Sequence, residues 1–111
     1  MIDIHIVRDD SGFVWEFTIE GHAGYGDQGT DIVCSAVSVL GYTAIGALQD
    51  VAAIDFKFSI DDNGFMKCSI PLDVPFHKKS EVKTILDTIV LGFKQIQLSY
   101  GKYVSVLDEE V

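Results

Sequence analysis

Basic residues are scarce in this sequence. Eight lysines and arginines stand against seventeen aspartates and glutamates, which gives a formal net charge of -9 over 111 residues. Such an acidic surface repels a phosphate backbone, so the composition argues against direct binding of nucleic acid. We expect this charge to attract a basic peptide or a basic protein instead.

Cysteine is almost absent as well, since the chain has only Cys34 and Cys68. Neither belongs to a C-x-x-C pair, and the histidines form no H-x-x-H pair, so we expect no metal site and no cofactor. His5 lies on the polar face of the first predicted strand and His77 lies beside two lysines, and both are interpreted as solvated. Cys68 falls on the core face of another predicted strand, where a structural role is expected.

The N-terminus lacks the basic segment and apolar run of a signal peptide, so we predict that the chain is not exported. Two cysteines in such a chain indicate free thiols in a reducing compartment, and we therefore expect a cytoplasmic protein.

An uncharged run from Ile32 to Gln49 is long enough to raise the question of a membrane span. Two glycines, several Ser and Thr residues, an acid at each end and the lack of flanking basic residues favour a buried helix. Because this helix is uncharged on every side, we expect one face to cover a sheet and another to contact a partner subunit. The pattern thus predicts a homodimer without a membrane span.

Apolar and polar residues alternate along five segments, which predicts five strands. The expected strands cover residues 2–6, 13–19, 54–60, 66–72 and 103–107, and an acidic tail, residues 108–110, follows the last one. Trp15 and Phe17 are expected on the core face of the second strand, and Leu72 on that of the fourth. With 48% hydrophobic residues, the chain can build one core, so we predict a single domain over residues 1–111.

Two helices are predicted between these strands. The first follows an N-cap at Thr30 or Asp31, and the second is capped by Ser80 and stopped by Gly101. Residues 61–64, Asp-Asp-Asn-Gly, are a strong hairpin signal between the third and fourth strands. The order ββαββαβ predicts an α+β two-layer sandwich, with a mainly antiparallel sheet and both helices on one face.

The segment from Gly21 to Cys34 places a histidine and a cysteine at the junction of a strand and a helix. His22 follows the strand and Cys34 lies in the first turn of the helix, so their side chains can meet beneath a glycine-rich loop. The free N–H groups and the dipole of a helix N-terminus favour a thiolate, and they can also hold the oxyanion of a tetrahedral intermediate. We therefore predict Cys34 as a nucleophile and His22 as its general base.

Other interpretations of the same segment stay open. A lone cysteine in an apolar helix is usually a core residue. Residues 24–29 also spell G-x-G-x-x-G some twenty residues ahead of Asp50, as in a dinucleotide fingerprint. The preceding strand belongs to a hairpin rather than to a parallel βαβ unit, and Asp27 would face the pyrophosphate, so this context argues against nucleotide binding.

Two further residues of the helix have alternative roles. The Asp31 carboxylate can cap the helix by accepting the Cys34 backbone N–H, or it can orient His22 as the third member of a triad, and the cap is favoured. Ser38 lies one turn beyond Cys34 on the same face. Its hydroxyl is expected to bond inside the helix, with a supporting role in catalysis as the alternative.

A resemblance to the ribosomal-processing cysteine protease family, Prp, rests on Gly21–Ala23, the glycine loop and Gly29–Cys34. It implies that Cys34 and His22 are catalytic and that the protein forms homodimers. It also implies a substrate, the bacterial large-subunit ribosomal protein L twenty-seven, which loses an N-terminal extension that ends in aromatic residues. A non-catalytic ribosome-assembly or peptide-binding module of the same fold is the alternative.

The glycine loop is interpreted as a lid over the bound peptide. Its glycines give it freedom to move, and its one aromatic side chain can contact a substrate. The residues expected to form the lid are Gly24, Tyr25, Gly26 and Gly29.

Overall fold

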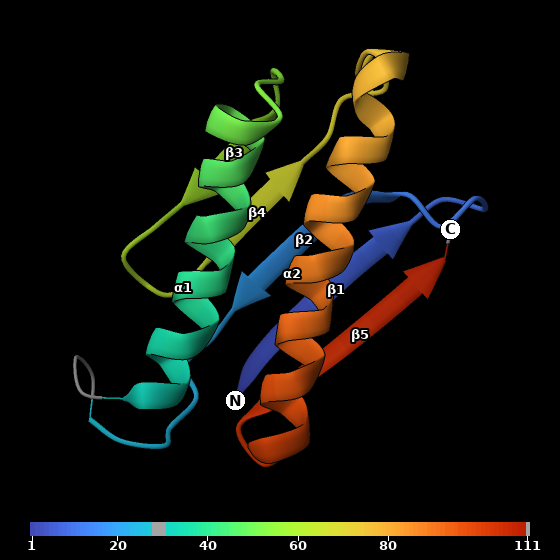
Figure 1. The fold of residues 1–111 in the computed structure, drawn as a ribbon. Coiled ribbons are helices and arrows are strands. Elements are labelled where there is room, and N and C mark those ends of the chain that lie inside the picture. Colours follow the sequence, from blue (N-terminus) through green and yellow to red (C-terminus); the bar gives the residue numbers. More distant parts are fainter. Residues whose placement is uncertain (28–30, 111) are drawn as a thin grey trace.

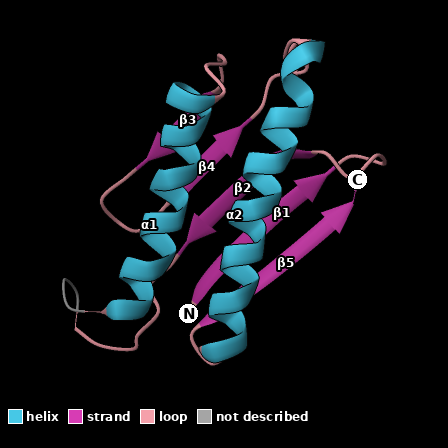
Figure 2. Ribbon diagram, viewed as in Figure 1, coloured by secondary structure: helices cyan, strands magenta, loops and turns pink. Residues whose placement is uncertain are grey.

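A five-stranded sheet lies beneath two long helices in the computed structural model, which describes residues 1–27 and 31–110 (Figure 1). The strands are β1 (Ile2–Arg8), β2 (Val14–Glu20), β3 (Lys57–Ile60), β4 (Met66–Ser69) and β5 (Val104–Glu110). The helical elements are α1 (Ile32–Gly46), the π-helical turn η1 (Ala47–Val51), the 3-10 turn η2 (Phe76–Lys78) and α2 (Lys79–Ser99). Both long helices cover the same face of the sheet (Figure 2), so the predicted ββαββαβ sandwich is confirmed.

The strands follow the order β3-β4-β2-β1-β5 across the sheet. The hairpins β1–β2 and β3–β4 are antiparallel, and β2 joins them by pairing antiparallel with β4. β5 pairs parallel with β1, with Ile2 opposite Val104. This parallel pair forms because α2 carries the chain back across the sheet before β5 begins.

The core fills the space between the helices and the sheet. Ile4 and Ile6 of β1, Phe17 of β2, Val37 of α1 and Phe93 of α2 are all fully buried. The Phe17 and Phe93 rings lie with their centroids 6.0 Å apart, which joins the centre of the sheet to α2.

Cys68 belongs to this core, in β4 opposite Phe17. Burial raises the pKa of the Cys68 thiol to about 12, and the negative charge of Glu16 adds to the shift. Because the thiolate is the reactive form, a thiol that ionises so weakly is a poor nucleophile at neutral pH.

The expected alternation in β2 is incomplete near Trp15. Trp15 packs against the core as predicted but is only half-buried, whereas its neighbour Val14 is fully buried. The pairing of β1 with β2 shifts between Val7 and Arg8, so that Arg8 faces Val14 rather than Trp15. This irregularity has the effect of a β-bulge: one extra residue in β2 interrupts the alternation, and Phe13 and Val14 are both buried.

β3 and β4 are shorter than predicted. β3 pairs only from Lys57 to Ile60, so Ile54 lies outside it. β4 ends at Ser69, because Pro71 has no N–H to donate to a ladder. Leu72, which was expected on the core face, is consequently 86% exposed.

The start of α2 also differs from the prediction. Ser80 lies inside α2, because the helix continues directly from η2. The N-cap residue of α2 is Lys78, whose side chain makes no capping hydrogen bond. The end of the helix at Ser99, just ahead of Gly101, is as predicted.

The residues predicted as an acidic tail are part of β5, and Arg8 of β1 explains why they extend the sheet. The Arg8 Nε and Nη2 atoms donate to both carboxylate oxygens of Asp108, at 2.8 and 3.2 Å. Arg8 Nη1 donates to Asp87 of α2 at 2.8 Å, and Lys94 Nζ donates to Asp108 at 2.8 Å. The cluster therefore ties β1, β5 and α2 together.

We predict that the contribution of this cluster to stability is lost in acid. Burial of the Asp108 carboxyl opposes its ionisation, but the hydrogen bonds from Arg8 and Lys94 outweigh burial and lower its pKa. Such a carboxyl stabilises the fold at pH values above about 4, the pKa that it has in the unfolded chain. This stabilisation is lost as the pH falls through its lower pKa in the folded protein. Asp108→Asn should lower the free energy of unfolding by about 1–3 kcal/mol near pH 7, and by less below about pH 4.

Urea unfolding at the two pH values measures this difference. Asp50→Asn, at an exposed carboxylate of η1, is the matched control and should change little at either pH. A loss for Asp108→Asn that is equal at both pH values would contradict the prediction.

Candidate active site

A cavity of about 270 Å³ opens where three segments meet at one end of the sheet. Its lining comes from the end of β2, from α1 and from the turn between β3 and β4, together with the start of β1. These residues are Ile2, Ile19, Gly21, His22, Cys34, Val37, Ser38, Tyr42, Asp61, Asp62 and Gly64. The predicted nucleophile and the predicted base thus open onto the same space.

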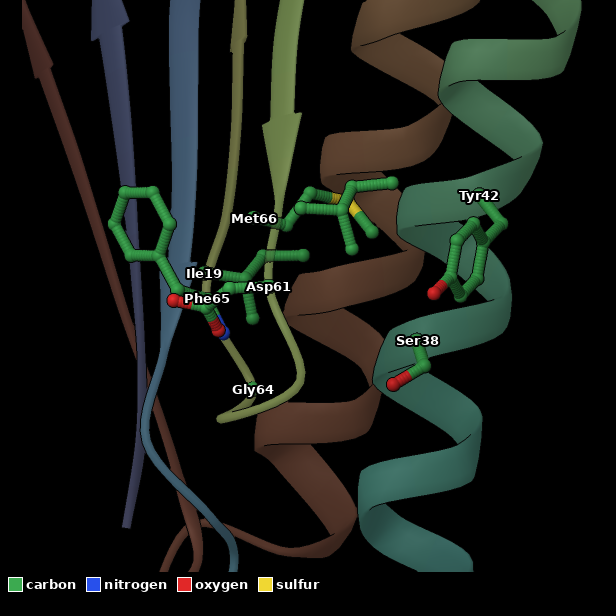
Figure 3. Close-up of a pocket in the computed structure, with 8 residues that line it drawn as sticks. Ile19, Ser38, Tyr42, Asp61, Gly64, Phe65 and Met66 are labelled. Atoms are coloured by element: carbon green, nitrogen blue, oxygen red, sulfur yellow. The ribbon is translucent and has the colours of Figure 1, made fainter.

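A smaller pocket of about 60 Å³ adjoins this cavity and shares five lining residues with it: Ile19, Ser38, Tyr42, Asp61 and Gly64. Figure 3 shows that Ser38 and Tyr42 point from α1 toward the β3–β4 turn. Ile60, Phe65 and Met66 add apolar surface to this pocket.

Asp31 organises the start of α1. Its Oδ1 atom accepts the backbone N–H groups of Val33 and Cys34, at 2.9 and 3.0 Å. Its Oδ2 atom accepts those of Tyr25 and Gly26, at 2.9 and 3.1 Å. One carboxylate therefore caps the helix and also fixes the loop that follows β2.

The Asp31 side chain is nearly inaccessible, with 4% of the residue exposed. Burial opposes ionisation of the carboxyl, but the backbone N–H groups of Cys34, Gly26, Tyr25 and Val33 outweigh burial and hold its pKa below the usual value. Asp31 is consequently a carboxylate at neutral pH. Both oxygens are engaged by backbone amides, which supports the cap over an orienting contact with His22.

Cys34 lies in the first turn of α1 and is half-buried. Its Sγ atom accepts the backbone N–H of Ala23 at 3.2 Å. This bond brings the chain just after β2 against the start of α1, as the strand-to-helix junction predicted. His22, the residue before Ala23, is exposed at the edge of the same cavity.

The expected oxyanion site at the start of α1 is not free. The N–H groups of Val33 and Cys34 donate to Asp31, so they cannot donate elsewhere without breaking the cap. The N–H of Ala23 is the donor that already faces the sulfur.

The described part of the predicted lid does not line the cavity in this structure. The Tyr25 ring packs edge-on against Tyr100 and Tyr103, with centroids 5.6 and 5.1 Å away. Gly24 has a positive φ of 71°, which makes the turn at this point easy for glycine. Gly29 lies outside the described residues.

Ser38 lines the cavity, and its hydroxyl forms no hydrogen bond with any described residue. The expected bond inside α1 is therefore not seen, although the neighbouring Thr43 hydroxyl makes such a bond to Val39.

Sequence reasoning missed Tyr42, Asp61, Asp62 and Gly64 as lining residues. The hairpin signal at 61–64 correctly predicted a turn, but it carries no information on what that turn touches. The spacing of Tyr42, two helical turns beyond Cys34, is the signal that could have placed it on the same face.

The dinucleotide interpretation finds no support in the described residues. The Tyr25 and Gly26 amides, which a phosphate would need in the G-x-G-x-x-G reading, donate to Asp31 instead. Over residues 1–27 and 31–110, no three His, Cys, Asp or Glu side chains converge in a way that could hold a metal ion.

Comparison with known proteins gives consistent matches. A sequence model of the family described as cysteine protease Prp matches residues 1–105. The ribosomal processing cysteine protease Prp of Staphylococcus aureus is 28% identical over 102 residues, which cover 92% of this chain and 93% of that protein. The Bacillus subtilis protein of the same name is 22% identical over 101 residues, 90% of each chain.

The fold has a solved counterpart as well. The S. aureus protease Prp, crystallised with a covalently linked product peptide, aligns with a TM-score of 0.87 at 24% identity, over 98% of this chain and 100% of that one. At that identity the likeness establishes the fold. The family match, in turn, spans both His22 and Cys34.

We predict that Asp31→Asn weakens the fold of the site as well as the activity. The amide side chain keeps one oxygen, so it can serve either α1 or the loop, and its NH₂ group would face N–H donors on the other side. Amide NMR signals of Tyr25, Gly26, Val33 and Cys34 should shift, and the unfolding midpoint should fall.

The conservative change Asp31→Glu is the companion variant, and it should recover part of the capping. A triad role would instead show as lost turnover at Asp31→Asn with unchanged stability and unchanged amide signals.

Proposed function

This chain belongs to the Prp family of cysteine proteases, and we propose that Cys34 is its nucleophile and His22 its general base. We further propose that it removes the N-terminal extension of the ribosomal protein L twenty-seven during ribosome assembly in the cytoplasm. The position of Cys34 carries the proposal: its thiol opens onto a cavity that His22 also lines, at the N-terminus of a capped helix.

The proton transfers of the proposed reaction involve only these two side chains, the substrate and water. His22 takes the proton of the Cys34 thiol, and the sulfur attacks the carbonyl carbon of the scissile peptide bond. The C–N bond breaks as His22 gives that proton to the leaving amine, and an acyl thioester stays on Cys34. A water molecule that loses a proton to His22 then hydrolyses the thioester, which releases the carboxylic acid and restores the thiol.

The oxyanion of the tetrahedral intermediate needs an N–H donor near the sulfur. The Ala23 N–H lies 3.2 Å from Sγ, whereas the amides of Val33 and Cys34 serve Asp31. We therefore assign Ala23 as a donor to the oxyanion. This choice leaves the cap of α1 intact during the reaction.

The surroundings of Cys34 support a peptide substrate with an apolar segment before the cut. The small pocket beside the cavity has Ile60, Met66 and the Tyr42 ring in its lining, so an apolar side chain of the substrate could contact apolar surface there (Figure 3). The related S. aureus protease has been crystallised with a substrate peptide and with a product peptide, which supports the same substrate class here. The net charge of -9 would attract a basic ribosomal protein.

The loop after β2 remains our candidate for a lid. Its contact with Tyr100 and Tyr103 holds Tyr25 away from the cavity, so closure over a peptide requires Tyr25 to leave these two rings. A lid that orders on the correct peptide would guard against unwanted proteolysis.

We predict that the two cysteines separate activity from stability. Cys34→Ala should abolish cleavage of a peptide that carries the extension and its cut site, with little change in the unfolding midpoint. Cys68→Ser, which puts a hydroxyl into the core, should lower stability by about 1–3 kcal/mol and leave turnover of the folded protein nearly unchanged. Mass spectrometry of the products and urea unfolding measure the two effects. Full cleavage by Cys34→Ala would refute the proposal and favour a peptide-binding module without catalysis.

We also propose that the outer face of the two helices forms a homodimer. The window Ile32–Val51 is apolar and long enough for a membrane span, yet it packs on the sheet and is only 33% buried in one chain. Val39 of α1 is 62% exposed and Leu98 of α2 is 89% exposed. Val39 also lines a groove of about 590 Å³ between α1 and α2, which a second copy could fill.

Light scattering at micromolar concentration should therefore give twice the chain mass of 12.2 kDa. Val39→Glu should yield monomers, because it buries a charge in the proposed interface. Leu72→Glu, at an even more exposed apolar position outside the groove, is the control and should stay dimeric. A monomeric wild type would rule the dimer out.

A further inference from the structure

The two hairpins of the sheet carry the same five-residue turn. Residues 9–13 read Asp-Asp-Ser-Gly-Phe between β1 and β2, and residues 61–65 read Asp-Asp-Asn-Gly-Phe between β3 and β4. In the first turn Asp9 Oδ1 accepts the N–H groups of Ser11 and Phe13, at 2.9 and 3.0 Å. In the second, Asp61 Oδ1 accepts those of Asn63 and Phe65, at 2.8 and 3.1 Å.

The glycines of the two turns also match in conformation. Gly12 has a φ of 86° and Gly64 a φ of 83°, a region that side chains rarely adopt. Backbone conformation therefore favours glycine to the same degree at positions 12 and 64.

Their surroundings differ. A Cβ placed on Gly12 would have no heavy atom within 4 Å. A Cβ on Gly64 would lie 2.7 Å from the Gly21 carbonyl oxygen, 3.2 Å from His22 Cε1 and 3.5 Å from His22 Nδ1. The second turn is thus packed against the end of β2 and against the imidazole ring, and Figure 3 shows Gly64 at the tip of that turn.

This contact matters because no hydrogen bond to a described residue holds the His22 ring. The ring is exposed and forms no hydrogen bond with a described residue. Asp31, the acid nearest in sequence, has both oxygens bonded to backbone amides. The β3–β4 turn at Gly64 is therefore an element close enough to the ring to position it, and it lines the same cavity as His22 and Cys34.

We propose that Gly64 is a positioning residue for His22: the absence of a side chain lets the β3–β4 turn approach and hold the imidazole. The proposal rests on the catalytic role proposed for His22. A methyl group at position 64 would lie 2.7 Å from the Gly21 carbonyl oxygen and 3.2 Å from the ring, so the turn would be pushed away from the end of β2 and the ring would be displaced with it. A misplacement of about 1 Å can cost about 100-fold in rate.

Gly64→Ala and Gly12→Ala form the test, because they bear the same backbone strain and differ in what the new methyl group meets. Gly64→Ala should lower kcat for peptide cleavage about 10- to 100-fold and slow iodoacetamide alkylation of Cys34 to a similar degree. Gly12→Ala should leave both rates within about twofold of wild type. Equal rates for the two variants would overturn the proposal.

A double-mutant cycle shows whether Gly64 acts through His22. With His22→Ala already present, adding Gly64→Ala should leave the alkylation rate of Cys34 unchanged. A further loss of the same size as in the wild-type background would mean that Gly64 acts elsewhere, and it would overturn the assignment.

Two of the measurements, alkylation and an NOE, do not depend on peptide cleavage. In the wild-type protein, an NOE should connect the Gly64 Hα protons with His22 Hε1, and its absence would overturn the proposal even if Gly64→Ala failed to fold. Alkylation and NOE measurements use no peptide. If the wild type cleaved no peptide, the proposed function would fail, while these measurements would still decide whether Gly64 positions the ring.

Discussion

The site depends on how Asp31 is bonded. Its carboxylate accepts amides from two segments, the start of α1 and the loop after β2, and so forces them together. The N–H of Ala23 then reaches the sulfur of Cys34. An N-cap ordinarily acts locally, by accepting the free N–H groups at the start of a helix. Here the second oxygen turns the same residue into the link between strand, loop and helix, and Asp31 is ionised because backbone donors surround it.

This arrangement has a consequence for the histidine. A carboxylate that serves four described amides has no capacity left to orient an imidazole, so the proposed dyad has no third hydrogen-bonded member among the described residues. In our proposal, packing sets the position of the ring instead. The β3–β4 turn can supply this packing, because β4 pairs with β2 and so brings Gly64 beside the end of β2. The order of the strands in the sheet thus determines which turn lies beside His22.

Much of the fold could be predicted, because it follows from local patterns. Period-two alternation identified the strands, and the uncharged run identified α1. The errors arise where tertiary contacts decide. Val14 joined the core beside Trp15 through a shift in pairing with β1, and Asp108 joined β5 because Arg8, far away in sequence, binds its carboxylate. A charged tail and a charged edge strand look alike until the partner of the charge is known.

The candidate site also combines residues that local sequence predicts with one that only tertiary contacts reveal. His22, Cys34 and Asp31 lie in one continuous segment, and their spacing across a strand-to-helix junction made their meeting predictable. Gly64 lies thirty residues beyond Cys34, in a turn whose sequence and hydrogen bonds nearly duplicate those of the first hairpin. Local sequence cannot tell these turns apart, since both demand glycine for the same backbone reason. The difference between them is created by the order of strands in the sheet, which places one turn in open space and the other against an imidazole.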